Sequence, residues 1–529
     1  MTLRQFAISV FALIVLLGFA FGRSFAASSV QPASTAESCV RIHWIGTKRI
    51  FADTNSAELR SIWAMPESLK LQEQTFGKLC AAPWRFLRGQ TNPASTNLLR
   101  PLLEDLVKEE FYIAIDQPAG TTNFPGEIVL AVHLDDQRAR SWETNIAAAL
   151  ESLTGIPITN SSRDHWVLKK HHAPNLIEFA RVGQWMVLGG AQNHNPLLDE
   201  TLARIQSGQP PFARHATNWF EADINTPRVL ANLGKGANFA AKLPRISLAA
   251  FGNAGSVHTT GELTFSGRDL ILLDPWNIPT NLVDGDLTSF AAIRGLQSWL
   301  AKSELWSNLQ SGPPPDQLYV WSLHSFPMET YFAAPSAAAS NMVSRLSDFV
   351  LRGGDAWAAT NGLAAFIRST NFNGIRWRGV PYTMPFLSSL ETNGQSYVLG
   401  GSFQFDPPLG HPPPDLVHEI QAHSNLVYYH WEITGPRIEQ VIFLEQFARL
   451  VSDKAQLSIE SAGLPWLKAD MSQMGNCTTE ITQIGPGRFS LNRSSAAGFT
   501  AAELNLIVDW LESPDFPFGL HTLFAPPGQ

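Results

Sequence analysis

The sequence predicts an α+β protein with two related modules in tandem, each an antiparallel sheet covered by helices, behind a helical N-terminal segment. An eight-residue motif that occurs twice predicts the duplication, and further landmarks follow in the same order around both copies. Strand patterns mixed with single amphipathic helices predict antiparallel rather than strictly alternating parallel sheets. A chain of 529 residues, 44% of them hydrophobic and 16% charged, excludes a disordered, collagen-like or coiled-coil protein.

The repeated motif gives the clearest sign of duplication. Residues 183–190 read Gly-Gln-Trp-Met-Val-Leu-Gly-Gly and residues 394–401 read Gly-Gln-Ser-Tyr-Val-Leu-Gly-Gly, so six of eight positions are identical. In both copies the pattern predicts a buried strand that ends in two glycines, which allow positive φ and a close approach to a neighbouring segment. After the first copy, Asn195 and Pro196 are typical of a helix start.

Other segments pair in the same order along the chain. The sequence matches 223–229 with 432–438, and the strand-like stretch 128–133 with 318–324, each leading into a helix. Residues 287–300 are expected to form a helix that matches the helix over 500–511. Thr500 and Glu503 form a capping box for the latter helix.

These observations divide the chain into five parts. The expected parts are a signal peptide or N-terminal anchor (1–26), a helical N-terminal segment (27–104), the first module (105–311), the second module (316–515) and a C-terminal tail (516–529). The helical segment has no counterpart in the repeat, and it is expected to pack on the first module as a separate cap. Proline-rich residues 311–315 form the expected linker between the modules.

The first 26 residues predict export. Arg4 precedes an uncharged, mostly apolar run over 6–22, and Ser24-Phe25-Ala26 resembles a small-x-small cleavage site. The protein is therefore expected in the periplasm, on the cell surface or in the medium. A membrane contact is expected only if the leader stays uncleaved.

The three cysteines lie after the leader, in a part of the chain where an oxidising compartment permits disulfides. A Cys39–Cys80 bridge with Cys477 unpaired is one reading, and three buried free thiols is the other.

Charge and motifs leave no catalytic residue to assign. A formal net charge of −8 without a basic stripe excludes a general nucleic-acid binder. His418 and His423 flank Glu419 at i and i+5, a spacing that turns the second imidazole away from the first and excludes the zincin pattern. Because no nucleophile elbow, phosphate loop or metal-ligand spacing is present, the sequence predicts no metal and no cofactor.

Five residues are candidate binding residues. His133 and His324 end two strands that the repeat matches, so they either line one site between the modules or bond to the backbone at sheet edges. Trp377 lies between Arg376 and Arg378 with glycines close by, so this stretch is either an exposed recognition loop or an ordinary strand edge.

The chain also resembles a group of large secreted proteins that occur in multicopy sets in some environmental bacteria. Residues 52–55, 62–63 and 66–68, together with the two Leu-Gly-Gly modules, carry this resemblance. It implies export and a duplicated α+β architecture. It supplies no activity and no catalytic residue.

The sequence therefore favours an exported, non-catalytic envelope protein that binds an unidentified envelope macromolecule or builds an envelope structure. The alternative is an exported hydrolase that acts on a polymer, with a site between the two modules. A third class, a periplasmic carrier of a small ligand, predicts more hinge crossings than one proline-rich linker. Polar and titratable groups converging in one pocket would favour the enzyme, whereas an apolar groove would favour the binding protein.

Overall fold

The structure is a computed structural model, and it describes most of the chain after residue 38. The expected signal peptide or anchor over 1–26 lies outside the described residues. The described ranges are 39–90, 94–116, 126–162, 164–169, 176–191, 194–212, 215, 217–232, 243–267, 271–283, 285–303, 306–307, 312–324, 329–361, 366–377, 384–403, 412–451, 461–514 and 516–517.

The fold is α+β, as expected, and its main feature is one antiparallel sheet of 20 strands. We call β1–β10 the first half-sheet and β11–β20 the second half-sheet. The strands of the first are β1 (Val40–Trp44), β2 (Phe111–Asp116), β3 (Glu127–His133), β4 (Thr159–Ser162), β5 (His165–Lys169), β6 (Leu176–Val182), β7 (Trp185–Ala191), β8 (Phe220–Asn225), β9 (Arg245–Asn253) and β10 (Ser256–Thr264). The strands of the second are β11 (Leu287–Arg294), β12 (Gln317–Leu323), β13 (Thr330–Pro335), β14 (Phe366–Arg368), β15 (Gly374–Trp377), β16 (Phe386–Thr392), β17 (Gln395–Gly401), β18 (Leu426–Ile433), β19 (Asn476–Gly485) and β20 (Arg488–Ser495).

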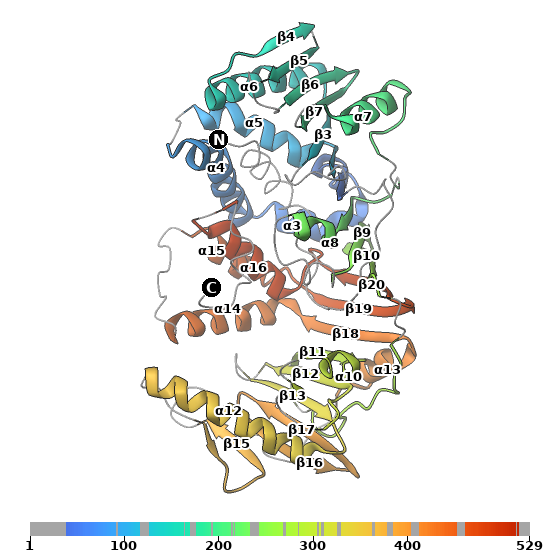
Figure 1. The fold of residues 1–529 in the computed structure, drawn as a ribbon, viewed down its shortest axis with the longest axis vertical. Coiled ribbons are helices and arrows are strands. Elements are labelled where there is room, and N and C mark those ends of the chain that lie inside the picture. The colour runs from blue at the N-terminus through green and yellow to red at the C-terminus, as the bar shows by residue number, and fades with distance from the viewer. Residues whose placement is uncertain are drawn as a thin grey trace.

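Pairings occur in the same order in both half-sheets. In the first the order is β4-β5-β6-β7-β3-β2-β1-β8-β9-β10. In the second it is β14-β15-β16-β17-β13-β12-β11-β18-β19-β20. Antiparallel pairing of β10 with β20 joins the two, from Val257 opposite Ser495 to Thr264 opposite Arg488. Figure 1 shows the strands stacked along the long axis of the molecule, with β10 and β20 near its middle.

Helices cover both faces of the sheet. They are α2 (Thr47–Ile50), the 3₁₀ turn η1 (Thr54–Ser56), α3 (Ala57–Trp63), α4 (Pro66–Arg88), α5 (Ser95–Lys108), α6 (Asp136–Thr154), α7 (Pro196–Gln206), α8 (Thr226–Asn232), α10 (Gln297–Leu300), α12 (Ala339–Asn361), α13 (Pro414–Ala422), α14 (Thr434–Val451), α15 (Gly463–Asp470) and α16 (Ala501–Glu512). In Figure 1, α4, α15, α16 and α14 follow one another along one side of the molecule, and α10 and α13 lie on the other side.

Helices pack on both faces of each half-sheet, which explains why strands such as β2 and β3 are apolar on both faces. In the first, α6 packs Trp142 and Ile146 against one face, and α7 packs Leu197 and Leu198 against the other. In the second, α12 packs on Ala334 and Val398, whereas α13 packs on the aromatic cluster around Phe290 and Tyr319. Because both faces are buried, strands such as β3 are nearly continuous apolar runs without the alternation of a half-exposed strand.

The repeated motif forms β7 and β17, and the close approach expected of its glycines is confirmed. A Cβ on Gly189 would lie 2.8 Å from the Leu198 side chain, and one on Gly401 would lie 2.4 Å from the Tyr331 ring. The positive φ expected there is wrong for these four glycines. It occurs instead in the preceding hairpin turns, at Gly183 with φ 61° and Gly394 with φ 74°.

The predicted helix starts are confirmed where the capping residues indicated them. Asn195 accepts a hydrogen bond from the Leu198 backbone N–H at the start of α7. Thr500 and Glu503 form the expected reciprocal capping box at the start of α16.

The helix expected over 287–300 is wrong. Residues Leu287–Arg294 form β11, which pairs with β12 and β18 in the centre of the second half-sheet, and only Gln297–Leu300 are helical. A strand buried on both faces is an unbroken apolar run, which periodicity alone does not separate from a buried helix.

Two further expectations about organisation need correction. Residues 27–104 are not a purely helical cap, because they contain β1, which pairs with both β2 and β8 inside the sheet. The described part of the expected linker, residues 312–315, lies between α10 and β12, within the second half-sheet. The connection between the half-sheets runs instead from β10 to β11.

No helix in the described ranges is long and apolar enough to cross a membrane.

Candidate functional site

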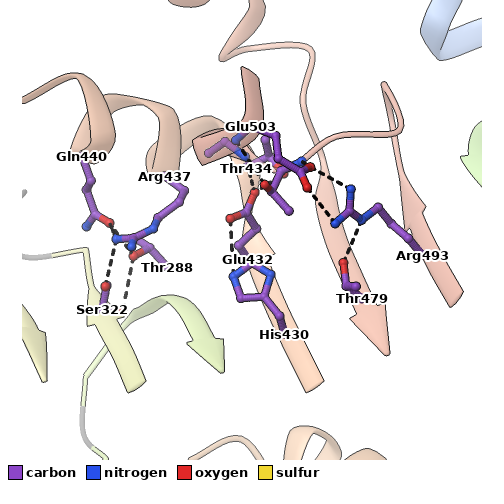
Figure 2. Close-up of polar contacts among 12 residues, drawn as sticks. Thr288, Ser322, His430, Glu432, Thr434, Arg437, Gln440, Thr479, Arg493 and Glu503 are labelled. Atoms are coloured by element: carbon purple, nitrogen blue, oxygen red, sulfur yellow. Dashed lines mark hydrogen bonds and ion pairs between the residues drawn. The ribbon is translucent and has the colours of Figure 1, made fainter. Parts of the chain in front are cut away.

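A buried polar cluster lies where β18 meets the starts of α14 and α16 (Figure 2). His430 and Glu432 project from β18, and Glu432 is only 2% exposed. The Glu432 carboxylate accepts hydrogen bonds from the Ala501 backbone N–H at 2.7 Å and from the Thr434 hydroxyl at 3.2 Å. It therefore caps the first turn of α16, where the helix dipole favours a negative charge.

Burial controls the protonation of this cluster. It raises the pKa of Glu432, and the backbone hydrogen bond from Ala501 opposes that shift. Burial lowers the pKa of His430 to about 4, helped by the positive charges of Arg437 and Arg493. His430 is thus neutral near pH 7, with its Nε2 atom 3.6 Å from the Glu432 carboxylate.

An ion pair continues the cluster toward β20. The Arg493 guanidinium donates to both carboxylate oxygens of Glu503, at 2.7 and 3.1 Å, and to the Thr479 hydroxyl at 2.9 Å. Glu503 also accepts from the Thr500 backbone N–H. The carboxylate that completes the capping box of α16 therefore also ties that helix to the sheet.

A second set of contacts fixes α14 to the central strands of the second half-sheet. Arg437 donates to the Ser322 hydroxyl at 2.9 Å and to the Gln440 side-chain oxygen at 2.8 Å. Gln440 accepts from the Thr288 hydroxyl and donates to the Leu323 carbonyl. None of these polar groups lines a pocket described below, so the cluster holds α14 and α16 on the sheet instead of presenting groups to a substrate.

The structure does not bring His133 and His324 together. His133 ends β3, is half-buried and lies edge-on to the Trp185 ring at 5.0 Å. His324 is exposed just after β12, and its backbone N–H donates to the Asp286 carbonyl. Along the sheet, β3 and β12 are ten strand spacings of about 4.8 Å apart, roughly 48 Å. Because β12 takes the place of β2 in the order of pairings, the match of 128–133 with 318–324 is off by one strand.

The Arg-Trp-Arg sequence lies beside the outer edge of the second half-sheet. Arg376 is half-buried in β15, opposite Ile367 of β14 and Phe386 of β16. The backbone of Trp377 ends β15, and Arg378 lies outside the described residues. These neighbours are those of an ordinary strand next to a sheet edge.

The three cysteines are buried, and none of them is in a disulfide in the structure. The Cys39–Cys80 bridge is not formed. Cys39 packs with the core of the first half-sheet, whereas Cys80 packs in a separate cluster with Trp510 and Phe516, so the two thiols lie in different layers. Burial raises the pKa of Cys80 to about 11, which keeps it a thiol.

Metal-ligating groups do not gather within the described ranges, where no set of three or more His, Cys, Asp or Glu residues could hold an ion. His165 instead contacts Glu178 at 2.6 Å across β5 and β6. His171 and His172 lie outside the described residues.

A large apolar pocket lies where α3, α4 and α5 face the helices α15 and α16, and we call it the inter-half pocket. Its volume is about 310 Å³. Helices α3, α4 and α5 and strands β2 and β3 form one side of it, and Trp466 of α15 with Ile507 and Leu511 of α16 form the other. All its described lining side chains are uncharged, and the polar ones are Ser68, Gln72 and Thr75 on α4.

A second apolar pocket, which we call the α6 pocket, lies beside the first. Its volume is about 140 Å³, and it lies among α4, α5 and α6. Four leucines line both pockets: Leu79, Leu103, Leu106 and Leu130. The two volumes are therefore adjacent parts of one apolar region beneath α4.

A third pocket lies where β10 and β20 meet, on the side of α10. Its volume is about 170 Å³, and apolar side chains such as Phe265, Ile293 and Phe489 form most of its wall. The cationic groups in the wall are Arg294 and Lys302. Arg294 already donates to the carbonyls of Leu426, Asp274 and Ser424, so it is committed to the loops around it.

Helical periodicity in the sequence predicts some of the side chains that line the inter-half pocket, but it does not predict the pocket itself. Leu71, Phe76 and Leu79 have the spacing of the apolar stripe of a helix, and all three are buried on α4. The partners Trp466, Ile507 and Leu511 come from the far end of the chain. Ser68, Gln72 and Thr75, at i, i+4 and i+7, form a polar row on one face of α4. This row beside the apolar stripe is the pattern in the sequence that indicates a pocket wall.

No protein-family model matches this chain, and no curated protein matches it either. Among solved structures, crystal forms III and I of TP0453 resemble part of it, with 10% and 11% sequence identity and TM-scores of 0.26 and 0.21. Each covers 46% of this chain, and the matches cover 82% and 99% of the TP0453 chains. Similarity at this level carries no conclusion about fold or function.

Proposed function

We propose that this protein is exported and acts as a non-catalytic binding protein of the bacterial envelope, holding the apolar part of an envelope molecule. The apolar lining of the inter-half pocket is the observation that supports this proposal. A hydrolase needs a general acid, base or nucleophile within reach of the bound substrate. The described wall of the inter-half pocket contains no carboxylate and no imidazole that could act as an acid or base or activate a hydroxyl. An apolar ligand, in contrast, needs only the apolar side chains of that wall.

The apolar wall of the pocket also favours an occupant. The pocket is partly open to solvent, so its apolar wall contacts water when nothing is bound. A bound apolar molecule would replace that water and stabilise the folded chain.

Two copies of one ten-strand unit form the proposed scaffold. The common order of pairings in β1–β10 and β11–β20 supports this duplication, as does the position of the repeated motif in β7 and β17. The inter-half pocket lies where α3, α4 and α5 of one unit meet α15 and α16 of the other. A duplicated unit thereby gains an apolar site that one copy would lack.

Purification from the envelope without detergent tests the proposal. We expect the protein in the exported fraction, shortened by 26 residues, with an apolar molecule recovered from it by solvent extraction and identified by mass spectrometry. Leu106→Trp, which adds bulk where the two pockets adjoin, should reduce the recovered molecule. Leu69→Trp is the matched control, because Leu69 is on α4, which supplies part of the wall, but is 53% exposed and outside that wall.

Three results would contradict the proposal. One is a protein that stays in the cytoplasm with its first 26 residues intact. Another is an exported protein from which solvent extracts no apolar molecule. The third is hydrolysis of a glycan, ester or peptide polymer by the purified protein, which would support the alternative of an exported hydrolase.

A further inference from the structure

We infer that the inter-half pocket and the α6 pocket together bind a single long hydrocarbon chain that carries an uncharged polar head group. This inference rests on the proposed function and specifies the ligand class for the same site. Three features of the described wall support it: the shape of the joined region, its size, and the kind of polar group at one end.

The joined region is long and follows α4. Its wall includes Ser68 near the start of α4 and Pro83 near the end of that helix. At 1.5 Å per residue, those fifteen residues span about 22 Å. The leucines shared by the two walls, Leu79, Leu103, Leu106 and Leu130, lie where the two pockets adjoin. A long apolar region fits an extended chain better than a compact ring system.

The size of the region favours one chain. The two pockets hold about 310 and 140 Å³. Both values lie toward or below the lower end of the roughly 300–1,000 Å³ that small-molecule pockets span. A second hydrocarbon chain would have to displace side chains from α5 and α6.

The polar side chains of the wall determine which kind of head group the pocket can bind. Gln72 and Thr75 face the inter-half pocket from α4. An amide and a hydroxyl can both donate to and accept from an ester, amide or hydroxyl group. Ser68 is already committed, because it donates to the Ile62 carbonyl and accepts from the Trp466 indole N–H.

Charged groups beside this end have partners within the chain. Lys78 donates to the Leu511 carbonyl at 2.7 Å, and burial lowers the pKa of its ammonium group. Glu73, one turn from Lys78, is paired with Arg100. An ionised head group would therefore enter an apolar wall with no counter-charge among the described lining residues, which is costly.

Displacement of a fluorescent probe from the full exported chain tests the inference. The probe is N-phenyl-1-naphthylamine, a neutral apolar dye that brightens in apolar sites. We expect saturable probe binding that 1-monooleoylglycerol reverses at a concentration at least tenfold lower than oleate does at pH 8, where oleate is ionised. Dioleoylphosphatidylcholine, which has two chains, should compete no better than oleate.

Two variants assign the site. Leu106→Trp should weaken probe binding at least tenfold, and Leu69→Trp should leave it unchanged. Thr75→Val keeps the shape of the wall but removes a hydroxyl, so it should weaken monooleoylglycerol about fivefold while probe binding stays the same. The Thr75 variant keeps the test informative even if Leu106→Trp does not fold.

The outcomes separate the two proposals. Equal or better displacement by oleate, or by the two-chain lipid, overturns the ligand class while apolar binding itself stands. If monooleoylglycerol does not compete better than oleate for the unsubstituted protein, the ligand class is overturned in the same way. Probe binding that occurs only after residues 518–529 are deleted would show that the chain fills the site itself, and this result overturns both proposals.

Discussion

Asp470 is a buried carboxylate at the last residue of α15. It is 0% exposed, and neither of its carboxylate oxygens has a hydrogen-bond partner in the part of the chain that the structure describes. Burial raises the pKa of Asp470 from 3.8 to about 7. The end of a helix carries a partial negative charge, so the position also disfavours an ionised carboxylate.

This shift predicts a pH-dependent stability. Between pH 4 and pH 7 the folded chain binds more protons at Asp470 than the unfolded chain does, so stability should fall as pH rises through this range. Asp470→Asn removes the ionisable group, and we expect it to raise the free energy of unfolding at pH 8 by on the order of 4 kcal/mol. At pH 4 the substitution should change stability little.

Urea denaturation at the two pH values measures this effect. Asp164→Asn, which changes a carboxylate with 54% side-chain exposure, is the control and should have a small effect at both. A gain from Asp470→Asn that is the same at pH 4 and pH 8 would contradict the assigned pKa.

Residue identity alone did not predict which charged groups are buried. Glu432, Arg493 and Asp470 are among the most buried charged residues of the described chain, yet none belongs to a motif with a known chemistry. Glu432 finds a partner on an element distant in sequence, the start of α16, and Arg493 pairs with Glu503 of the same helix. The sequence does not specify these pairings, because they depend on which strand follows which in the sheet.

At the scale of single elements, glycines of α4 and β17 should respond oppositely to the same substitution. Gly77 is in the exposed middle of α4, and a Cβ there would meet nothing within 4 Å. Gly77→Ala should stabilise the protein by about 0.5–1 kcal/mol, because alanine loses less backbone entropy than glycine on folding.

Gly401→Ala should destabilise the protein instead. A Cβ there would lie 2.4 Å from the Tyr331 ring and 2.9 Å from the Thr330 carbonyl, so β13 and β17 would have to separate. We expect a loss of about 1–3 kcal/mol, typical of overpacking. Thermal unfolding of both variants checks the signs, and a stabilising Gly401→Ala would show that the two strands are not so close.

Elements with local signals were predicted well, and elements buried on both faces were not. Asn195 caps α7 and Thr500 caps α16 as expected, because capping depends on residues within one turn. Residues 287–294 form β11 instead of a helix, and Val40–Trp44 form β1 inside a segment expected to be helical. Their strand state comes from neighbours on both sides, which periodicity does not record.

The whole molecule is expected to unfold in one step, although its sheet has two similar halves. Hydrogen bonds link α4 to the C-terminal helices, from Trp466 to Ser68, from Lys78 to the Leu511 carbonyl, and from Arg85 to the Phe516 carbonyl. The β10–β20 pairing adds Arg488 bonded to Glu262 across the halves. Loss of either half would leave the other with an unpaired strand edge and an open apolar pocket.

Coincident transitions test this expectation. Far-ultraviolet circular dichroism and tryptophan fluorescence should report one midpoint in urea, since neither half-sheet is complete alone. Two separated transitions would mean that the halves are independently stable. Trp466→Phe, which removes the bond to Ser68, should lower the common midpoint without splitting it.

The sequence by itself determined the α+β class, the repeated motif, the capped helices and the lack of catalytic motifs, because each of these depends on a short stretch of chain. Only the tertiary structure decided that β1 and β11 are central strands, that His133 and His324 lie far apart, and that α4 faces α15 and α16. These features depend on contacts between residues that lie from tens to hundreds of positions apart in the sequence. The inter-half pocket belongs to this second group, since its wall exists only when both ends of the chain are folded together.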